Sequence, residues 1–205
     1  MYKRLAARWF KRCIVKCRMY RPEFAVYITL AVMNEIDEVV HIVEYQADWP
    51  AVAANELSRL LPALAGMHVG IEHIGSTSVP GMAAKPVIDL MLGVVTYPPP
   101  ERIRLVLESL GYISYGEGSV PGRLYFVLRG ARDINLHAVG LGQQHWTNNL
   151  ALRDYLRRNP EARAQYAEAK RKAIGDGART LLSYSAAKAD TVAALVHAAR
   201  SANDG

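Results

Sequence analysis

Cysteine is scarce in this sequence and absent from most of it. The chain of 205 residues has two cysteines, Cys13 and Cys17, and none from residue 35 onward. No second Cys or His pair lies near these two, so we exclude a zinc site of the usual spacing and interpret them as incidental thiols. A body without cysteine is typical of a reducing compartment, and we expect a cytoplasmic protein.

The sequence also lacks a long apolar run near its N-terminus. The apolar stretch there covers residues 24–33, which is too short to span a bilayer. The basic residues before it resemble the start of a signal peptide, but no clear small-residue cleavage site follows, and the next segment is acidic. We therefore expect neither a membrane span nor export.

An excess of positive charge is missing from the body of the chain. The whole sequence has a net charge of +6, but residues 1–34 hold eight lysines and arginines against one glutamate, which gives +7. Subtracting 7 from 6 leaves −1 for residues 35–205. Binding to nucleic-acid phosphates needs a cationic surface, so we expect no nucleic-acid partner. We divide the chain into a basic N-terminal extension, residues 1–34, and one globular domain, residues 35–205.

Three well-known catalytic motifs are absent. Gly75 and Gly81 come nearest to a P-loop, but Met82 follows them instead of Lys-Ser or Lys-Thr, which argues against an ATP-dependent kinase of the P-loop type. The Gly-x-Ser-x-Gly nucleophile elbow and the His-Glu-x-x-His metal motif are missing too. A serine hydrolase that pairs Ser76 or Ser78 with His137 has no motif to support it.

What the sequence does contain is a regular succession of strands and helices. A helix begins near Pro50, because proline is tolerated at the first helical position. Its apolar stripe consists of Val52, Leu57, Leu60, Leu61 and Leu64. We expect strands over residues 67–74, 86–95, 112–115, 123–129 and 133–139, and helices over 101–110, 145–159, 160–174 and 183–199. Strands interleaved with helices, then helices alone, predict an α+β or α/β domain with a mixed sheet and a C-terminal helical group.

The turn between the first two expected strands is suited to bind phosphate. Residues 75–78, Gly-Ser-Thr-Ser, offer backbone N–H groups and hydroxyls where small residues allow close approach. Asp89 then interrupts the apolar second strand, where a carboxylate is costly without a partner. Lys85 precedes that strand, so its charge can reach either a phosphate or Asp89. This arrangement suits a phosphate and a metal.

Further polar residues lie on the neighbouring strands. Alternation in the last expected strand places Asn135 and His137 on one face, where His137 is either a ligand or a satisfied core histidine. Glu72 or His73 would approach Asp89 if the first two strands are neighbours. A solvated strand edge is the alternative for each of them.

The expected C-terminal helices carry cations that could face an anionic ligand. Arg153 and Arg157 are four residues apart on one helix, as are Tyr166 and Lys170 on the next. The same pattern describes a solvated helix face with aromatic anchors. Both interpretations stay open, with Arg153 and Lys188 as the main candidates for ligand contacts.

Several of these segments together resemble a known family. They are Tyr45 with Trp49-Pro50, His73-Ile-Gly-Ser-Thr-Ser-Val-Pro-Gly81, Lys85-Pro-x-Ile-Asp89, Asn135-Leu-His137, Leu152-Arg-Asp-Tyr-Leu-Arg157 and Tyr184-x-x-x-Lys188. From about residue 40 to residue 199 the chain resembles the GrpB family of the nucleotidyltransferase superfamily, a domain type that also occurs fused to some dephospho-CoA kinases. The resemblance implies a nucleotidyltransferase fold, a mixed sheet with the Gly-Ser turn at the triphosphate position.

The resemblance also implies ligands and roles. A nucleoside triphosphate and Mg²⁺ would bind, and a nucleotidyl group would be transferred to a small acceptor. The phosphate contacts would be Gly75, Ser76, Thr77, Ser78, Arg153 and Lys188. The catalytic residues would be Asp89, Lys85 and His137, and the metal ligands would be Asp89, Glu72 and His137. The alternative is a non-catalytic module that binds a nucleotide or a CoA-like anion.

One departure from the superfamily pattern favours that alternative. Members usually carry two acids, two positions apart, on the second strand, and a third acid on a later strand. In this sequence Met91 stands two positions after Asp89, and the later strand offers His137. The metal site is therefore depleted relative to a two-metal enzyme.

The family resemblance bears on the N-terminus as well. Family members tend to begin shortly before the segment Val43-x-Tyr45, and Met33 lies ten residues before Val43. Residues 1–32 are therefore either an upstream translation of the true start or a genuine basic extension.

Overall fold

The structure, a computed structural model, describes residues 37–67, 69–118 and 120–202. These residues form one compact unit, which begins at Asp37. The expectations about residues 1–34 lie outside the described residues.

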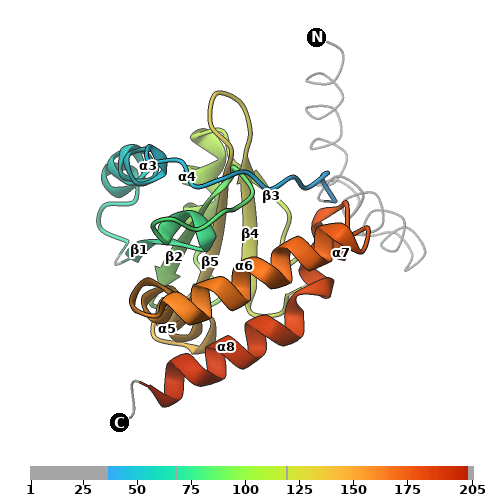
Figure 1. The fold of residues 1–205 in the computed structure, drawn as a ribbon. Helices are drawn as coiled ribbons and strands as arrows, with labels where there is room; N and C mark the ends of the chain where they lie inside the picture. Colours follow the sequence, from blue (N-terminus) through green and yellow to red (C-terminus); the bar gives the residue numbers. More distant parts are fainter. Residues whose placement is uncertain (1–36, 68, 119, 203–205) are drawn as a thin grey trace, which may run out of the picture. The chain divides into compact units, whose positions relative to one another are not determined.

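The described part of the chain is built on a five-stranded mixed sheet (Figure 1). The strands are β1 (Val69–Ile74), β2 (Ile88–Val94), β3 (Ile113–Ser114), β4 (Arg123–Leu128) and β5 (Ile134–Gly140), in the order β1-β2-β5-β4-β3. β2 and β5 pair in parallel and the other neighbours are antiparallel. The five expected strands are all present, with ends that move by one or two residues.

β2 is an inner strand of the sheet, and its sequence is apolar on both faces. Every residue from Leu90 to Val94 is buried, and Asp89 is the one position of the strand that is not fully covered. Such a continuous apolar run is typical of a strand that is enclosed on both sides. The expectation that this strand is apolar and covered on both faces is confirmed, and Asp89 is its one acid.

Helices cover the two faces of the sheet (Figure 1). α3 (Trp49–Ala63) and α4 (Glu101–Ser109) pack on one face, where the largest core cluster includes Leu60, Leu90 and Leu107. The C-terminal helices α5 (Gln144–Arg158), α6 (Pro160–Gly175), α7 (Leu181–Ala187) and α8 (Ala189–Ser201) lie on the other side. The predicted α+β fold, a mixed sheet flanked by helices with a C-terminal helical group, is confirmed.

The apolar stripe expected on α3 is wrong at one position. Leu61 is 52% exposed, whereas Glu56 is buried. The Glu56 carboxylate accepts a hydrogen bond from the Tyr112 hydroxyl at 2.7 Å and pairs with the Arg59 guanidinium at 2.6 Å. A buried acid with two donors satisfies its hydrogen bonds, so the helix can turn this residue inward and leave Leu61 outside.

α5 packs closely on the sheet because two glycines leave room for it. A Cβ on Gly93 would lie 2.6 Å from the Trp146 ring, and one on Gly70 would lie 3.1 Å from the same ring. Trp146 belongs to α5 and packs beside Met91 and Val139 in a second, smaller cluster. This contact fixes the start of α5 over β1 and β2.

The last expected helix, over residues 183–199, is in fact two helices. α7 ends at Ala187 and α8 begins at Ala189, and the backbone of Lys188 between them has φ −107° and ψ 2°. A capping box between Thr180 and Ser183 starts α7. The break places Lys188 at a junction instead of within a helix.

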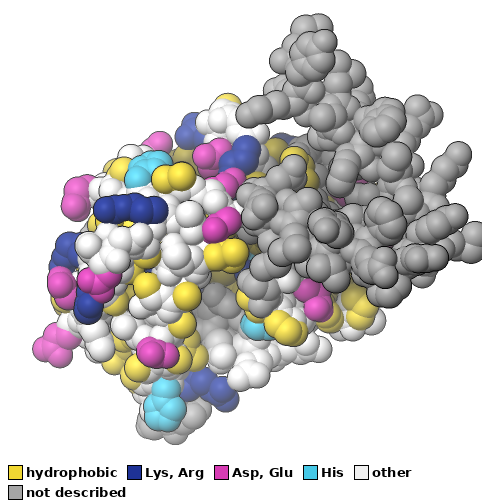
Figure 2. Space-filling view, turned by 90° about the vertical axis from the view of Figure 1, so that its right-hand side faces the viewer, with side chains coloured by type: hydrophobic (Ala, Val, Ile, Leu, Met, Phe, Trp, Pro, Cys, Tyr) yellow, Lys and Arg dark blue, Asp and Glu magenta, His cyan; other side chains and the backbone are white. Residues whose placement is uncertain are grey.

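Charges of both signs are mixed on the surface. Figure 2 shows basic and acidic side chains interspersed on the visible face of the described part. The arrangement agrees with the near-neutral charge of residues 35–205. Among the described helices, we find none whose length and hydropathy would allow it to cross a membrane.

Candidate functional site

A cleft of about 450 Å³ opens between the sheet and the C-terminal helices. Its floor comes from β2, β5 and β4, and one wall comes from the turn after β1. Side chains of α5, α6, α7 and α8 form the other walls. The cleft brings together most of the predicted site residues, namely Gly75, Ser76, Thr77, Lys85, Asp89, His137, Arg153 and Lys188.

The turn after β1 packs closely against Asp89. Gly75 has φ +70° and ψ −173°, a conformation that is essentially restricted to glycine. A Cβ on Gly75 would lie 2.8 Å from Oδ2 of Asp89. The glycine therefore serves both the backbone conformation and the close approach to the carboxylate.

The three hydroxyls of the turn have different roles. Ser78 donates its hydroxyl to the carbonyl of Gly75 at 2.6 Å, and Thr77 Oγ1 lies 2.9 Å from Nε2 of His73. Both of these hydroxyls hold the turn itself. The Ser76 hydroxyl makes no hydrogen bond within the described part of the chain, and it lines the cleft. Of the three, Ser76 is the one available to a ligand.

Asp89 is surrounded by hydrogen-bond donors on one of its oxygens. Oδ1 accepts from Asn135 at 2.9 Å and lies 3.4 Å from both the Lys85 ammonium and Nε2 of His137. Burial by itself raises the pKa of this carboxyl, but Lys85, His137 and Asn135 outweigh it and hold the pKa well below its usual range. Asp89 is thus a carboxylate at every physiological pH.

His137 lies in the middle of the cleft between an acid and a cation. Its Nδ1 is 3.4 Å from Nη1 of Arg123, and its ring stacks on Tyr125 with centroids 5.2 Å apart. Because arginine only donates, we infer that Nδ1 accepts and that Nε2 carries the proton toward Asp89. Burial lowers the pKa of His137, while Asp89 partly opposes the shift. The ring is therefore neutral near pH 7.

Lys188 reaches the cleft from the break between α7 and α8. Its ammonium lies 3.5 Å from the Tyr166 hydroxyl and 5.1 Å from the centroid of the Tyr184 ring. Aromatic faces and hydroxyls stabilise a cation without neutralising it. Among the described residues no carboxylate pairs with Lys188, so its ammonium can contact an anion in the cleft.

Two arginines of α5 hold the opposite wall in place. Arg153 donates from Nη1 to Oε2 of Glu72 at 2.7 Å and to the carbonyl of His73 at 3.2 Å. Arg157 donates from Nε and Nη2 to the carbonyl of Ser78 at 3.0 and 2.9 Å. Both contacts fix α5 to β1 and its turn. Arg153 therefore positions α5, and because it also lines the cleft, its phosphate contact stays a prediction.

A metal ion would find one carboxylate in this cleft. Glu72, which the sequence places in the metal site, is 41% exposed and pairs with Arg153. His73 turns to Thr77, and Met91 is fully buried in the sheet. Across the described residues there is no group of three or more His, Cys, Asp or Glu side chains that could hold a metal. Mg²⁺ usually takes one or two carboxylates together with phosphate oxygens and water, so the residues fit a single ion on Asp89.

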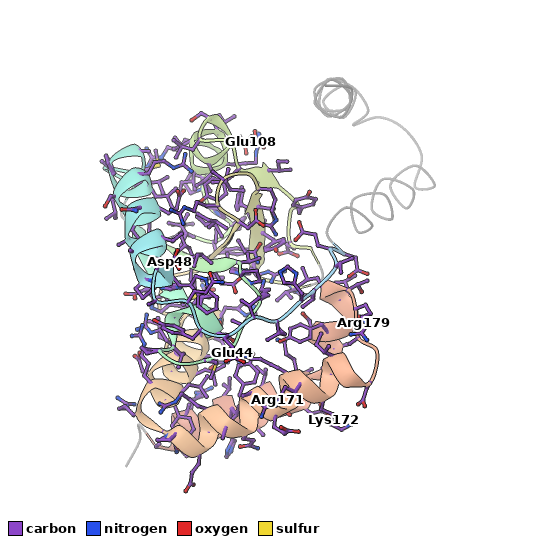
Figure 3. All side chains as sticks on the ribbon, turned by 45° about the horizontal axis from the view of Figure 1, so that its top comes forward. Glu44, Asp48, Glu108, Arg171, Lys172 and Arg179 are labelled. Atoms are coloured by element: carbon purple, nitrogen blue, oxygen red, sulfur yellow. The ribbon has the colours of Figure 1, made fainter. Side chains whose placement is uncertain are left out.

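Lys170 is an internal lysine next to this site. It is 2% exposed, donates to the carbonyl of Ala83 at 2.8 Å, and lies 4.5 Å from the centroid of the Tyr166 ring. The next two residues, Arg171 and Lys172, point away from the sheet into solvent (Figure 3). Burial, with a smaller contribution from Lys188, lowers the pKa of Lys170 to about 7.

This lysine should make stability depend on pH. An unfolded lysine holds its proton up to about pH 10.4, so between pH 7 and that value the unfolded chain binds more protons than the folded chain. We expect the free energy of unfolding to rise with pH in this window, by up to about 1.4 kcal/mol per unit. Lys170→Met should remove the rise, whereas Lys172→Met should keep it. Urea denaturation at pH 7.5 and 9 measures the free energy of unfolding at each pH. An equal rise between the two pH values for wild type and Lys170→Met would contradict the prediction.

Sequence reasoning missed Arg123 as a site residue. It is the first residue of β4, two positions before Tyr125, and both line the cleft. Alternation places them on the same face of the sheet as His137, with which Tyr125 is in register. The alternation of side chains along the strand could therefore have indicated that Arg123 faces the site. A basic residue at the start of a strand is, however, usually interpreted as exposed to solvent.

Two distant similarities concern the fold and part of the sequence. A dephospho-CoA kinase from Mycolicibacterium paratuberculosis is 27% identical over 160 residues, which cover 65% of this chain and 39% of the kinase. The structure of terminal uridylyl transferase 4 from Trypanosoma brucei with bound CTP also superposes weakly on this chain. That superposition has a TM-score of 0.43 and 17% identity over 71% of this chain and 47% of the transferase.

Closer similarities identify the family. A UPF0157 protein from Pseudomonas aeruginosa is 35% identical over 67% of this chain, and the match spans 58% of that relative's length. One from Halalkalibacterium halodurans is 34% identical over 80% of this chain and 85% of the relative. The crystal structure of GrpB from Enterococcus faecalis superposes with a TM-score of 0.71 and 28% identity over 80% of this chain and 100% of that chain. The family model described as GrpB protein matches residues 39–198, so this chain belongs to the GrpB family.

Proposed function

We propose that this protein binds a nucleoside triphosphate with one Mg²⁺ in the cleft and transfers the nucleotidyl group to a small acceptor. The observation that supports this most strongly is the approach of the Gly75 turn to Asp89. A small-residue turn with a free hydroxyl lies directly beside a lone ionised carboxylate. The first suits a phosphate and the second suits the metal that accompanies it.

The surrounding cations support the same ligand. The phosphates would lie on Ser76 and the N–H groups of its turn, between Lys85 on one side and Lys188 on the other. Lys85 is 21% exposed and shares Asp89 with two neutral donors, so its charge also acts on a phosphate in the cleft. Fixed positive charge around a transferring phosphoryl group is the main means by which such sites stabilise the transition state.

The reaction would break a phosphoanhydride bond of the triphosphate and form a phosphoester bond to the acceptor. An oxygen of the acceptor forms a bond to the α-phosphorus, the bond between that phosphorus and the bridging oxygen breaks, and pyrophosphate leaves. The acceptor hydroxyl gives up its proton, for which neutral His137 is the candidate base once the acceptor has displaced Arg123 from Nδ1. Mg²⁺, held by Asp89, would neutralise charge on the phosphates.

A second candidate function is binding without chemistry. Met91 occupies the strand position where the superfamily pattern has a second acid, and three donors already surround Oδ1 of Asp89. A cleft with these features would still hold a nucleotide or another small anion. The protein would then sense its ligand instead of converting it.

Calorimetric titration with each of the four ribonucleoside triphosphates, with and without Mg²⁺, tests the proposal. We expect binding by the wild type and affinity at least about tenfold weaker, about 1.4 kcal/mol, for Ser76→Ala, because its hydroxyl contacts the phosphates. Ser58→Ala, an exposed serine on α3, is the matched control and should bind like the wild type. Unchanged affinity of Ser76→Ala would count against the assigned phosphate contact, and absence of product with intact binding would favour the second candidate.

A further inference from the structure

Arg123 is a half-buried cation in the cleft, and the described residues offer it no acid at contact distance. Its guanidinium carbon lies 4.9 Å from the centroid of the Tyr125 ring, and its one polar contact within the described residues is Nη1 to Nδ1 of His137 at 3.4 Å. Nε of Arg123 is buried and donates to nothing among the described residues. A guanidinium has five N–H donors, and among the described residues only Nη1 of Arg123 meets an acceptor.

Other partly buried arginines of the fold are paired. Arg129 lies 2.8 Å from a carboxylate oxygen of Glu38, and Arg153 lies 2.7 Å from one of Glu72. Leaving a buried cation unpaired costs free energy, which an anion in the cleft would recover. Arg123 therefore differs from its neighbours in having donors to offer to a ligand.

The position of Arg123 separates it from the phosphate turn. The strand order is β1-β2-β5-β4, so the turn after β1 and Asp89 on β2 lie on one side of His137, and Arg123 on β4 lies on the other. Two strand spacings, roughly 10 Å, separate β2 from β4. A triphosphate on the turn would leave the space beside Arg123 for a second molecule.

We propose that Arg123 binds an anionic group, a carboxylate or a phosphate, of the acceptor substrate. This inference rests on the proposed function, because the acceptor is defined by the nucleotidyl transfer. The guanidinium offers two parallel N–H donors, which match either anion. Arg123 would bind the anionic group and His137 would face the reacting hydroxyl. Because the two side chains are close, the hydroxyl and the anionic group of the acceptor would be separated by only a few bonds. The acceptor class is thus a small hydroxyl compound that carries a carboxylate or a phosphate.

The side-chain Nε signal of Arg123 in ¹H–¹⁵N nuclear magnetic resonance spectra reports this contact directly. The buried Nε proton exchanges slowly, and the signal lost in Arg123→Lys identifies it. The protein is first saturated with Mg²⁺ and a non-hydrolysable ATP analogue, and is then titrated with inorganic phosphate or, separately, with malonate. We expect a saturable shift of the Arg123 signal with at least one anion, and the stronger of the two identifies the acceptor's anionic group.

Variants separate this site from the phosphate turn. Arg123→Lys and Arg123→Gln should weaken the added anion at least about tenfold, whereas Ser76→Ala should weaken the ATP analogue and not the anion. Melting curves establish that each variant is folded. If a variant does not fold, the titration of the wild type still tests the proposal. Arg59→Gln, on the opposite face of the sheet, should leave anion binding unchanged.

Three results are decisive. No shift with either anion at concentrations up to about 50 mM, far above a millimolar Kd, overturns the inference. A full shift with the ATP analogue alone, and none on adding anions, also overturns it, because Arg123 would then contact the donor's phosphates. Anion binding at Arg123 without any binding of the ATP analogue would support the anion site and refute the proposed triphosphate function instead.

Discussion

Replacing Asp89 by asparagine should weaken the binding of Mg²⁺ and a nucleoside triphosphate at least about tenfold, about 1.4 kcal/mol. The substitution is nearly isosteric and removes the charge that would hold the metal. It also leaves the partly buried Lys85 without its anion, and we expect a loss of about 3 kcal/mol in the free energy of unfolding. Titration calorimetry and urea denaturation measure the two effects on the same protein.

Asp133→Asn is the matched control for this prediction. Asp133 lies just before β5, is exposed, and receives one long hydrogen bond from the N–H of Gly130 at 3.4 Å. It should behave like the wild type in both measurements. A folded Asp89→Asn that binds the triphosphate with undiminished affinity would refute the role of Asp89 as a metal ligand. Loss of stability alone, with affinity unchanged, would mean that Asp89 has a structural role as the ion-pair partner of Lys85.

Gly75→Ala should be the most damaging of the small substitutions in the turn. The new Cβ would lie 2.8 Å from Oδ2 and 3.1 Å from Cβ of Asp89, and the backbone at φ +70° disfavours any side chain. Asp89 is held by its bonds to Oδ1, so it cannot move away freely. We expect a loss of at least about 3 kcal/mol in stability, the sum of backbone strain and steric overlap, together with loss of triphosphate binding.

Gly81→Ala separates the two contributions. Gly81 also has a positive φ, +76°, but a Cβ there would meet nothing within 4 Å. It should cost about 1 kcal/mol, the backbone strain alone, and leave triphosphate binding intact. If both variants lose the same stability, the close approach between Gly75 and Asp89 contributes nothing, and the geometry on which the site is built is incorrect.

The regular parts of the fold could be predicted from the sequence because their signals are local. Pro50, the apolar run of β2 and the glycines after β1 and α4 each determine the conformation of their own neighbourhood. Asp89 stood out for the same reason, since a charge within an apolar strand is conspicuous without knowledge of its neighbours. The parallel pairing of β2 with β5 then brings Asp89 and His137 together.

The remaining features depend on contacts between residues far apart in sequence. Glu72 and Arg153 are 81 positions apart, and their ion pair ties the Glu72 carboxylate to α5. The junction at Lys188 has no glycine or proline to mark it, so the sequence predicts one helix there. The hydroxyls of Thr77 and Ser78 form hydrogen bonds with His73 and Gly75. A pattern of small residues in the sequence does not reveal these bonds.

The most direct test of the central claim, that the cleft holds a triphosphate and its metal beside Asp89, is a crystal structure with Mn²⁺ and a non-hydrolysable ATP analogue. Mn²⁺ stands in for Mg²⁺ and gives an anomalous signal. We expect an anomalous peak about 2 Å from an oxygen of Asp89, with the phosphates on the Ser76 turn. A triphosphate bound outside the cleft, or a metal that is not in contact with Asp89, would contradict it.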